Sequence, residues 1–447
     1  MAKNVSSKRA IGIVWLTIFI DLVGFSIIFP IFPAMLEWYL PREETGSFLH
    51  RMITLFEGLT QGVNQKFLVA VLFGGFLGSL YSFLQFFASP FWGRLSDGMG
   101  RRRVLLFTTT GTALSYLLWI FSGSFLVLVL ARILGGIMSG NIAVATASIA
   151  DLTDTRGRSR GMALVGVAFG LGFILGPALG GLGSLVDLGV NPESEAVFGL
   201  TPFSFPALLA FLLSVLNIIW VWRAFPETLD ARDKEKHLRD PGPLLRLGSR
   251  IPDVRRALVV NFIFILAFAG MEFTLTFLAL ERLFYQPHQM ALLFLFIGLV
   301  LSLTQGLLVR RLAHRFGERN FTTLGLLAGT LSLVCLSVSQ STGLFYTGLF
   351  LLGFGVGCAS PSLSALVSLY APANRQGAEL GAFRSIGALG RAIGPLYGAA
   401  IYWWLGSQTA YLTAAALLFV AALFSLLLPK PDKGEAVVSV PASVPGS

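Results

Sequence analysis

Two carboxylic acids, Asp21 and Glu272, stand inside long apolar segments of this 447-residue chain. Asp21 lies about ten residues, or roughly 15 Å of helix, past the start of its segment, which would place it near the middle of a bilayer. Burial there favours the neutral acid, so each carboxyl group could bind and release a proton. Both acids are candidates for proton coupling. The alternative is that each forms a permanent ion pair with an arginine inside the membrane.

Three arginines also fall within apolar segments, where each needs a partner, water or a headgroup. Arg384 and Arg391 are seven residues apart and therefore share one helical face. If that face points inward, it attracts a carboxylate or an anionic headgroup; the alternative is that it neutralises the two acids. Arg132, in the fourth apolar segment, and Asn141 complete the candidates for a substrate cavity.

A short basic run between the second and third apolar segments combines Gly93, Asp97, Gly100 and Arg101. Asp97 can accept hydrogen bonds from a helix N-terminus, and Arg101 can reach a neighbouring carboxylate. The sequence therefore predicts a conformational latch, with Asp97 at the start of the eleventh segment and Arg101 on Asp151 at the end of the fourth. A merely solvated loop is the alternative.

The fifth apolar segment is dense in glycine and has one internal proline. Small residues let another helix approach closely, and proline bends the helix that contains it. The residues of this predicted helix-packing motif are Gly172, Gly176, Pro177, Gly180 and Gly181.

The high apolar content of the chain indicates that these segments lie in a membrane. Hydrophobic residues make up 55% of the chain and charged residues 13%, well below the charged fraction of soluble proteins. Twelve segments are long enough to cross a bilayer. They lie near 11–36, 68–91, 104–122, 125–149, 161–183, 203–223, 256–279, 289–309, 321–339, 343–370, 377–403 and 408–428. We therefore predict an all-α membrane protein of twelve transmembrane helices in two pseudo-symmetric six-helix bundles.

The net charge of +10 is explained by topology rather than by nucleic-acid binding, because the basic residues form short clusters between apolar segments. Alternate loops carry these clusters, so both termini are predicted in the cytoplasm of a protein integral to the inner or plasma membrane. The two cysteines lie in apolar segments and the four histidines are scattered, so neither a disulfide framework nor a metal site is expected.

The two halves are internally related, since the glycine and proline pattern of 176–180 recurs at 394–398. The predicted organisation is an N-terminal bundle with a long external loop, a cytoplasmic linker, a C-terminal bundle and a disordered tail. These parts are 1–223 with the loop 37–66, then 224–255, 256–428 and 429–447.

The external loop contains apolar residues at helical spacing, which predicts a short amphipathic helix on the membrane surface or, alternatively, a lid. Its expected apolar face is Phe48, Met52, Leu55, Phe56 and Leu59.

These motifs resemble those of a known family. The basic run matches the G-x-L-x-D-x-x-G-R-R loop of the major facilitator superfamily at Gly93, Leu95, Asp97, Gly100, Arg101 and Arg102. The fifth segment is similar to the G-x-x-x-G-P-x-x-G-G motif of drug:proton antiporters, and Arg132 with Gly136 resembles their R-x-x-x-G element. The runs at 132–136, 166–170 and 270–275 look like the tetracycline-transporter-like (TETRAN) branch.

The resemblance implies a secondary active transporter that exports small amphiphilic organic compounds, including organic anions, by alternating access. We expect a proton gradient as the driving force, no cofactor, no enzymatic activity and a monomer in the lipid bilayer. The alternatives are a lipid or lysolipid flippase of the same fold and a non-transporting membrane receptor.

Overall fold

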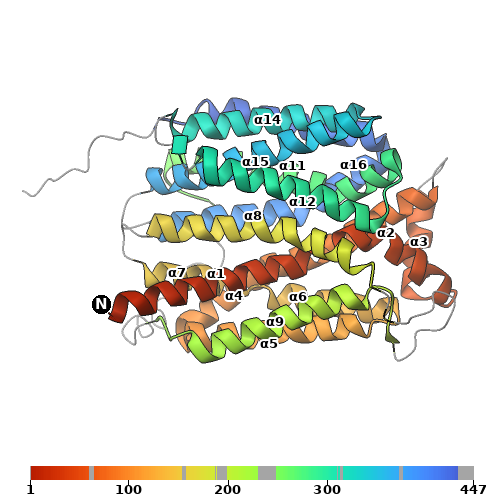
Figure 1. The fold of residues 1–447 in the computed structure, drawn as a ribbon, viewed down its shortest axis with the longest axis horizontal. Coiled ribbons are helices and arrows are strands. Elements are labelled where there is room, and N and C mark those ends of the chain that lie inside the picture. The colour runs from red at the N-terminus through yellow and green to blue at the C-terminus, as the bar shows by residue number, and fades with distance from the viewer. Residues whose placement is uncertain are drawn as a thin grey trace, which may run out of the picture.

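The chain is helical throughout the part that the structure, a computed structural model, describes (Figure 1). The described residues are 2–59, 65–153, 158–186, 188, 199–229, 248–309, 311–312, 316–371 and 376–430. Within these ranges no strand is present.

The N-terminal half contains the helices that end before the predicted linker. They are α1 (Ala2–Ser26), η1 (Phe29–Ile31), α2 (Phe32–Tyr39), η2 (Leu40–Arg42), α3 (Phe48–Leu59), α4 (Gln65–Met99), α5 (Arg101–Ile120), α6 (Phe125–Met138), α7 (Asn141–Leu152), α8 (Arg158–Gly183) and α9 (Ser204–Ala224). The helices of the C-terminal half are α11 (Pro252–Leu283), α12 (Pro287–Leu303), the π-helix η4 (Thr304–Val309), α14 (Glu318–Val338), α15 (Thr342–Tyr370) and α16 (Gln376–Ser425).

These helices supply twelve membrane crossings, as the sequence predicts. Ten apolar stretches of the described helices are long enough to span a bilayer. One of them, α16, turns at Gly406, whose φ is 82°, and therefore provides two crossings. The remaining crossing is α8, whose apolar part is Gly170–Gly183.

The two halves lie side by side with their long helices roughly parallel (Figure 1). They meet where α4 packs on α16 and where α8 packs on α12. At the first contact a Cβ on Gly75 would lie 2.9 Å from the Cβ of Ala399, and at the second a Cβ on Gly298 would lie 2.1 Å from Ile174. The end of the bundle that carries Asp97 is called the Asp97 side below, and the opposite end, which carries α3, the α3 side.

Glycines bring pairs of helices within backbone contact in both halves. On α8, a Cβ at Gly172 or Gly176 would lie within 3.1 Å of backbone or side-chain atoms of α1. Gly180 is closer still, because its Cβ would stand 1.8 Å from the carbonyl oxygen of Ile27. Pro177 and Gly181 are buried in the same helix.

The same arrangement recurs between α11 and α16. A Cβ at Gly398 would lie 2.7 Å from the carbonyl oxygen of Gly270, and Gly394 is equally close to α11. The repeated glycine pattern of the sequence thus corresponds to a repeated packing of α8 on α1 and of α16 on α11.

Two local expectations need correction. Residues 93–99 continue α4, so the reversal is made by Gly100 alone, whose φ of 103° is open to glycine. The helix α3 is present, but the side chains it buries are Leu49, Met52 and Ile53, whereas Phe48 and Leu55 are exposed. The spacing of apolar residues did not distinguish these two faces because both carry apolar side chains.

Some expectations fall partly outside the described residues. Most of the predicted linker, 230–247, and the tail 431–447 lie there, as do the side chains of Phe56 and Leu59 in α3. The boundaries of the predicted parts remain predictions.

Candidate functional site

A cavity lies between α8 of the N-terminal half and four segments of the C-terminal half, and its empty volume is about 850 Å³ with the adjoining open solvent included. Its wall is formed by Gly170 and Ile174 of α8, Asn261, Phe264, Ile265, Phe268 and Glu272 of α11, Ile297 and Leu301 of α12, Val356 and Ser360 of α15, and Phe383, Arg384, Gly387 and Arg391 of α16.

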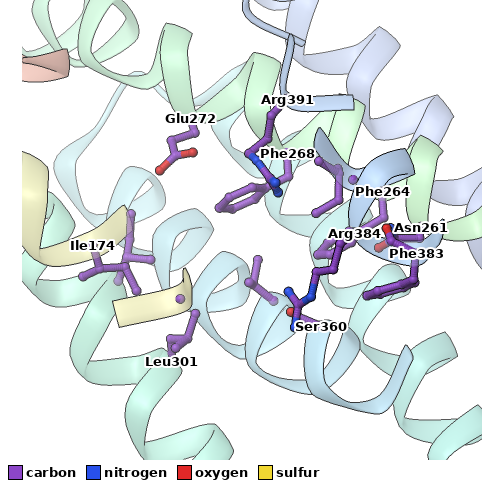
Figure 2. Close-up of a pocket in the computed structure, with 15 residues that line it drawn as sticks. Ile174, Asn261, Phe264, Phe268, Glu272, Leu301, Ser360, Phe383, Arg384 and Arg391 are labelled. Atoms are coloured by element: carbon purple, nitrogen blue, oxygen red, sulfur yellow. The ribbon is translucent and has the colours of Figure 1, made fainter. Parts of the chain in front are cut away.

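Three charged side chains face this cavity among the described residues: Glu272, Arg384 and Arg391. Figure 2 shows the Glu272 carboxyl group and the Arg391 guanidinium reaching into the same space from α11 and α16, with Arg384 further along α16. Glu272 is only 5% exposed and lies within electrostatic range of Arg391. With the acid ionised, these three groups sum to one positive charge.

Hydrogen-bond donors gather around Gly387. The Asn261 amide donates to the carbonyl oxygen of Phe383 at 3.2 Å and so ties α11 to the turn of α16 that bears Arg384. A Cβ built on Gly387 would lie 3.4 Å from Nδ2 of Asn261 and 3.7 Å from a terminal nitrogen of Arg391. The missing side chain leaves a notch beside these donors.

The remaining wall is apolar. The rings of Phe264 and Phe268 follow each other on α11 with centroids 6.1 Å apart, and Ile174 and Leu301 close the opposite side (Figure 2). Glu272 lies eleven residues after Asn261, so the polar groups spread over roughly 16 Å along α11. The cavity therefore offers an apolar slot with charged groups spread along it.

Asp21, Arg132 and Asn141 do not line this cavity, contrary to the expectation for Arg132 and Asn141. They form a separate buried cluster with Tyr81 and Tyr116 inside the N-terminal half. The Arg132 guanidinium lies over the Tyr81 ring, 4.3 Å from its centroid. Position along the chain predicts the depth of these residues in the membrane, but not which way each helix faces.

Asp21 is not held by an ion pair with Arg132, which was the alternative to a proton-binding role. Its Oδ2 atom has no hydrogen-bond partner, nor do Nε and one terminal nitrogen of Arg132. The Asn141 side chain lies beside the Asp21 carboxyl group. This cluster consequently keeps spare hydrogen-bonding capacity within the N-terminal half.

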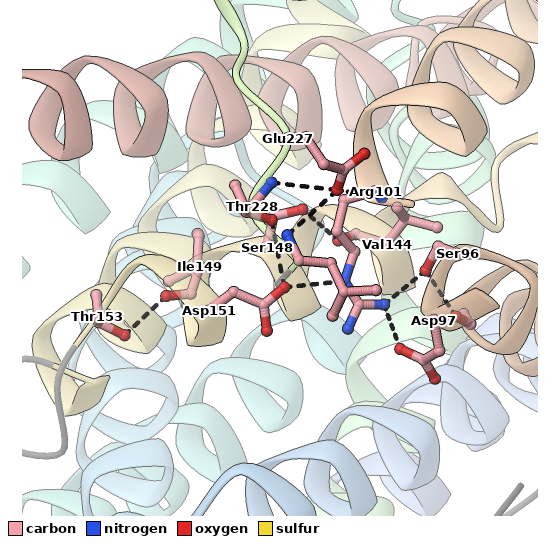
Figure 3. Close-up of polar contacts among 12 residues, drawn as sticks. Ser96, Asp97, Arg101, Val144, Ser148, Ile149, Asp151, Thr153, Glu227 and Thr228 are labelled. Carbon is pink, nitrogen blue, oxygen red and sulfur yellow. Dashed lines mark hydrogen bonds and ion pairs between the residues drawn. The ribbon is translucent and has the colours of Figure 1, made fainter. Parts of the chain in front are cut away.

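The predicted latch residues meet on the Asp97 side (Figure 3). Arg101 forms an ion pair of 2.5 Å with Asp97 and donates from Nε to Asp151 at 3.0 Å. It also donates to the Ser96 hydroxyl at 2.6 Å. Gly93 faces Ala143, so α4, α5 and α7 converge here. Asp97 was expected to meet the eleventh segment near 376–379; the side chains of 376–378 lie outside the described residues, and Glu379 is buried.

Glu227 joins this network, although sequence reasoning did not select it. One of its carboxylate oxygens accepts from the backbone N–H of Arg101 at 2.9 Å, at the start of α5. The same oxygen accepts from the N–H groups of Thr228 and Leu229 at 3.1 and 3.2 Å. An acid just after a predicted span, facing the N-terminus of another helix, was the available signal.

Twelve membrane crossings in two glycine-packed halves, with a charged cavity between them, define an integral membrane transporter of the two-bundle type. The chain belongs to the Major Facilitator Superfamily, whose family model matches residues 14–395 and 285–443.

Individual relatives agree with this assignment. The chain is 32% identical to mouse Major facilitator superfamily domain-containing protein 10 over 95% of its own length and 94% of that protein. It is 28% identical to the class B tetracycline resistance protein of Escherichia coli, with 89% of each chain covered. The crystal structure of the human organic anion transporter MFSD10 (TETRAN) superposes with a TM-score of 0.75 at 31% identity, covering 94% of this chain and 99% of that one.

Proposed function

We propose that this protein is a proton-coupled secondary transporter that moves small amphiphilic organic compounds, organic anions among them, across the membrane. The observation that carries the proposal is the cavity itself, in which an apolar slot is combined with Glu272, Arg384 and Arg391. Aromatic and aliphatic walls suit the body of an amphiphile, while the charged groups suit its polar end. The names of the tetracycline resistance and organic anion transporter relatives point to cargo of this kind.

Glu272 is the proposed proton carrier. It is the acid among the described residues that line the cavity, and it shares that cavity with the cargo. Its own helix carries no basic residue between Arg256 and Arg282, so a change in its surroundings can alter its protonation as the halves move. Asp21 is the second candidate, located in the other half.

The way the halves touch supports transport by alternating access. On the α3 side, Phe32 contacts Phe273 with ring centroids 6.1 Å apart, and Gly74 packs against Phe273 and Phe277. The cavity extends from Glu272 along α11 toward Asn261, that is, toward the Asp97 side. We assign the Asp97 side to the cytoplasm because its loops carry the arginine clusters. Cargo in the cavity would then exchange with the cytoplasm.

The test compares gradient-driven and exchange transport in proteoliposomes that contain the full chain. With tetracycline and 2-naphthalenesulfonate as cargo, we expect accumulation driven by a pH gradient in the wild type. Glu272→Gln should abolish this accumulation while counterflow at zero gradient persists, because glutamine keeps the shape of the side chain but cannot release a proton. Glu281→Gln is the matched control, since Glu281 lies on the same helix and bonds to Ser407 on the α3 side.

Unchanged pH-driven accumulation in Glu272→Gln would exclude Glu272 as the carrier. Loss of both activities would mark it as a cargo ligand or a structural residue instead. Absence of counterflow in the wild type for every compound would refute transport of this cargo class.

A further inference from the structure

The inference concerns the direction of proton coupling and rests on the proposed function. The cavity holds one acid and two arginines, and a proton on Glu272 changes their summed charge from one positive charge to two. Cargo bound in the same cavity experiences this change directly, because the carboxyl group and the guanidinium groups face one space (Figure 2).

Among the described residues that face the cavity, no other acid offsets the charge that a proton adds on Glu272. The elements α8, α12 and α15 present Ile174, Leu301 and Ser360, which carry no charge. On α16 the charged groups are the two arginines, and the phenol of Tyr411 meets Thr274 at 3.5 Å beyond the cavity wall. On the α3 side, the neighbouring Phe273 packs against the apolar Phe32, Gly74 and Phe277.

Linkage makes the effect reciprocal. If a proton on Glu272 strengthens the binding of a ligand, that ligand strengthens the binding of the proton by the same factor. An anion is attracted more strongly once Glu272 is neutral, so the anion and the proton bind together. A cation favours the ionised acid and therefore competes with the proton.

We propose that the charge of the cargo sets the sign of the coupling: organic anions move in the same direction as the proton, whereas organic cations exchange against it. The notch at Gly387, beside Asn261 and Arg391, is the proposed position of the anionic group. The inward proton gradient would then drive anions into the cytoplasm and cations out of it, through one cavity.

The test measures binding and proton release or uptake on the purified full-length protein in detergent. The probes share one aromatic body: 2-naphthalenesulfonate, which stays anionic throughout, (2-naphthylmethyl)trimethylammonium, which stays cationic, and neutral 2-naphthalenemethanol. Because none of these probes titrates between about pH 5 and pH 8, any pH dependence comes from the protein. Affinity is measured by calorimetry in two buffers that differ in ionisation enthalpy, which also gives the protons exchanged per ligand.

We expect the sulfonate to bind ~10-fold more tightly at the acidic end of this range. Its binding should be accompanied by the uptake of up to about one proton by the protein. The ammonium probe should behave in the opposite way, and the alcohol should show little dependence on pH. Glu272→Gln should bind the sulfonate tightly at every pH with no proton uptake. Glu281→Gln should behave as the wild type, and both variants are checked for a monodisperse elution profile.

Sulfonate binding that is independent of pH, or that weakens with acid, overturns the inference. So does a proton uptake that survives in a folded Glu272→Gln. If none of the three probes binds, the proposed function fails, and this inference fails with it. Transport in proteoliposomes provides the second measurement: the sulfonate should accumulate on the side that protons enter.

Discussion

Adding one methyl group at Gly398 should separate two helices that position the charged cavity. Gly398 lies on α16, and its built Cβ would stand 2.7 Å from the carbonyl oxygen and 2.9 Å from the Cα of Gly270 on α11. Ordinary contact begins at 3.4 Å, and both neighbours are backbone atoms that cannot rotate away. Gly398→Ala must therefore move one helix relative to the other by several tenths of an ångström.

The magnitude follows from two opposing effects. Overpacking an interior contact costs about 1–3 kcal/mol, whereas replacing glycine by alanine inside a helix contributes about 0.5–1 kcal/mol of stability. Gly381 lies on the same helix and has nothing within 4 Å of its built Cβ, so Gly381→Ala should show the gain alone. The two variants should consequently differ by about 1–3 kcal/mol in the free energy of unfolding, with Gly398→Ala the less stable.

Unfolding in mixed micelles, followed by tryptophan fluorescence against the fraction of denaturing detergent, measures this difference. Counterflow of 2-naphthalenesulfonate, a functional readout, should also fall in Gly398→Ala, because the shift displaces Arg391 relative to Glu272. Equal stability of Gly398→Ala and Gly381→Ala would refute the claim that α11 and α16 are in backbone contact.

Substitutions at three further residues test individual contacts by thermal unfolding. Arg101→Gln should lower the free energy of unfolding by up to about 3 kcal/mol, because it leaves two carboxylates without their cation at a largely buried site. Arg101→Lys should recover only part of this loss, since lysine lacks the planar fork that reaches Asp97 and Asp151 together. Glu227→Ala should cost about 1 kcal/mol through loss of the cap on α5. Asn261→Ala should cost about 1 kcal/mol for its lost hydrogen bond and should raise the KM for the sulfonate.

The results that contradict these expectations are distinct. Wild-type stability of Arg101→Gln would mean that the network on the Asp97 side contributes nothing to the folded state. Wild-type stability of Glu227→Ala would remove the proposed cap. An unchanged KM in Asn261→Ala would show that this amide neither positions Arg384 nor approaches the cargo.

The fold could be predicted because the bilayer imposes a simple rule on sequence. Each crossing needs a long apolar run, and these runs stand out in this chain. The repeated glycine pattern also indicated a duplication, since close helix packing requires small residues at fixed spacing. The breaks within crossings were not predicted: the fourth crossing is divided into α6 and α7, and the eighth ends in the π-helix η4. Neither break coincides with a proline.

The site was harder to predict because an apolar helix does not reveal which face points inward. Charged residues gave the depth of Glu272, Arg384 and Arg391, but the same reasoning grouped Arg132 with them, and the structure places Arg132 in a separate buried cluster over the Tyr81 ring. Asn261 was overlooked because an amide near the start of a span has no distinctive spacing.

The central claim is that the cavity between α8, α11 and α16 binds the cargo and is open to the Asp97 side. Ser360 lines it, so Ser360→Cys, made in a background without Cys335 and Cys358, places one thiol in its wall. A membrane-impermeant thiol reagent should label this cysteine faster from the Asp97 side than from the α3 side of oriented vesicles, and saturating 2-naphthalenesulfonate should slow the labelling. Labelling at one rate from both sides, unaffected by the sulfonate, would contradict the account.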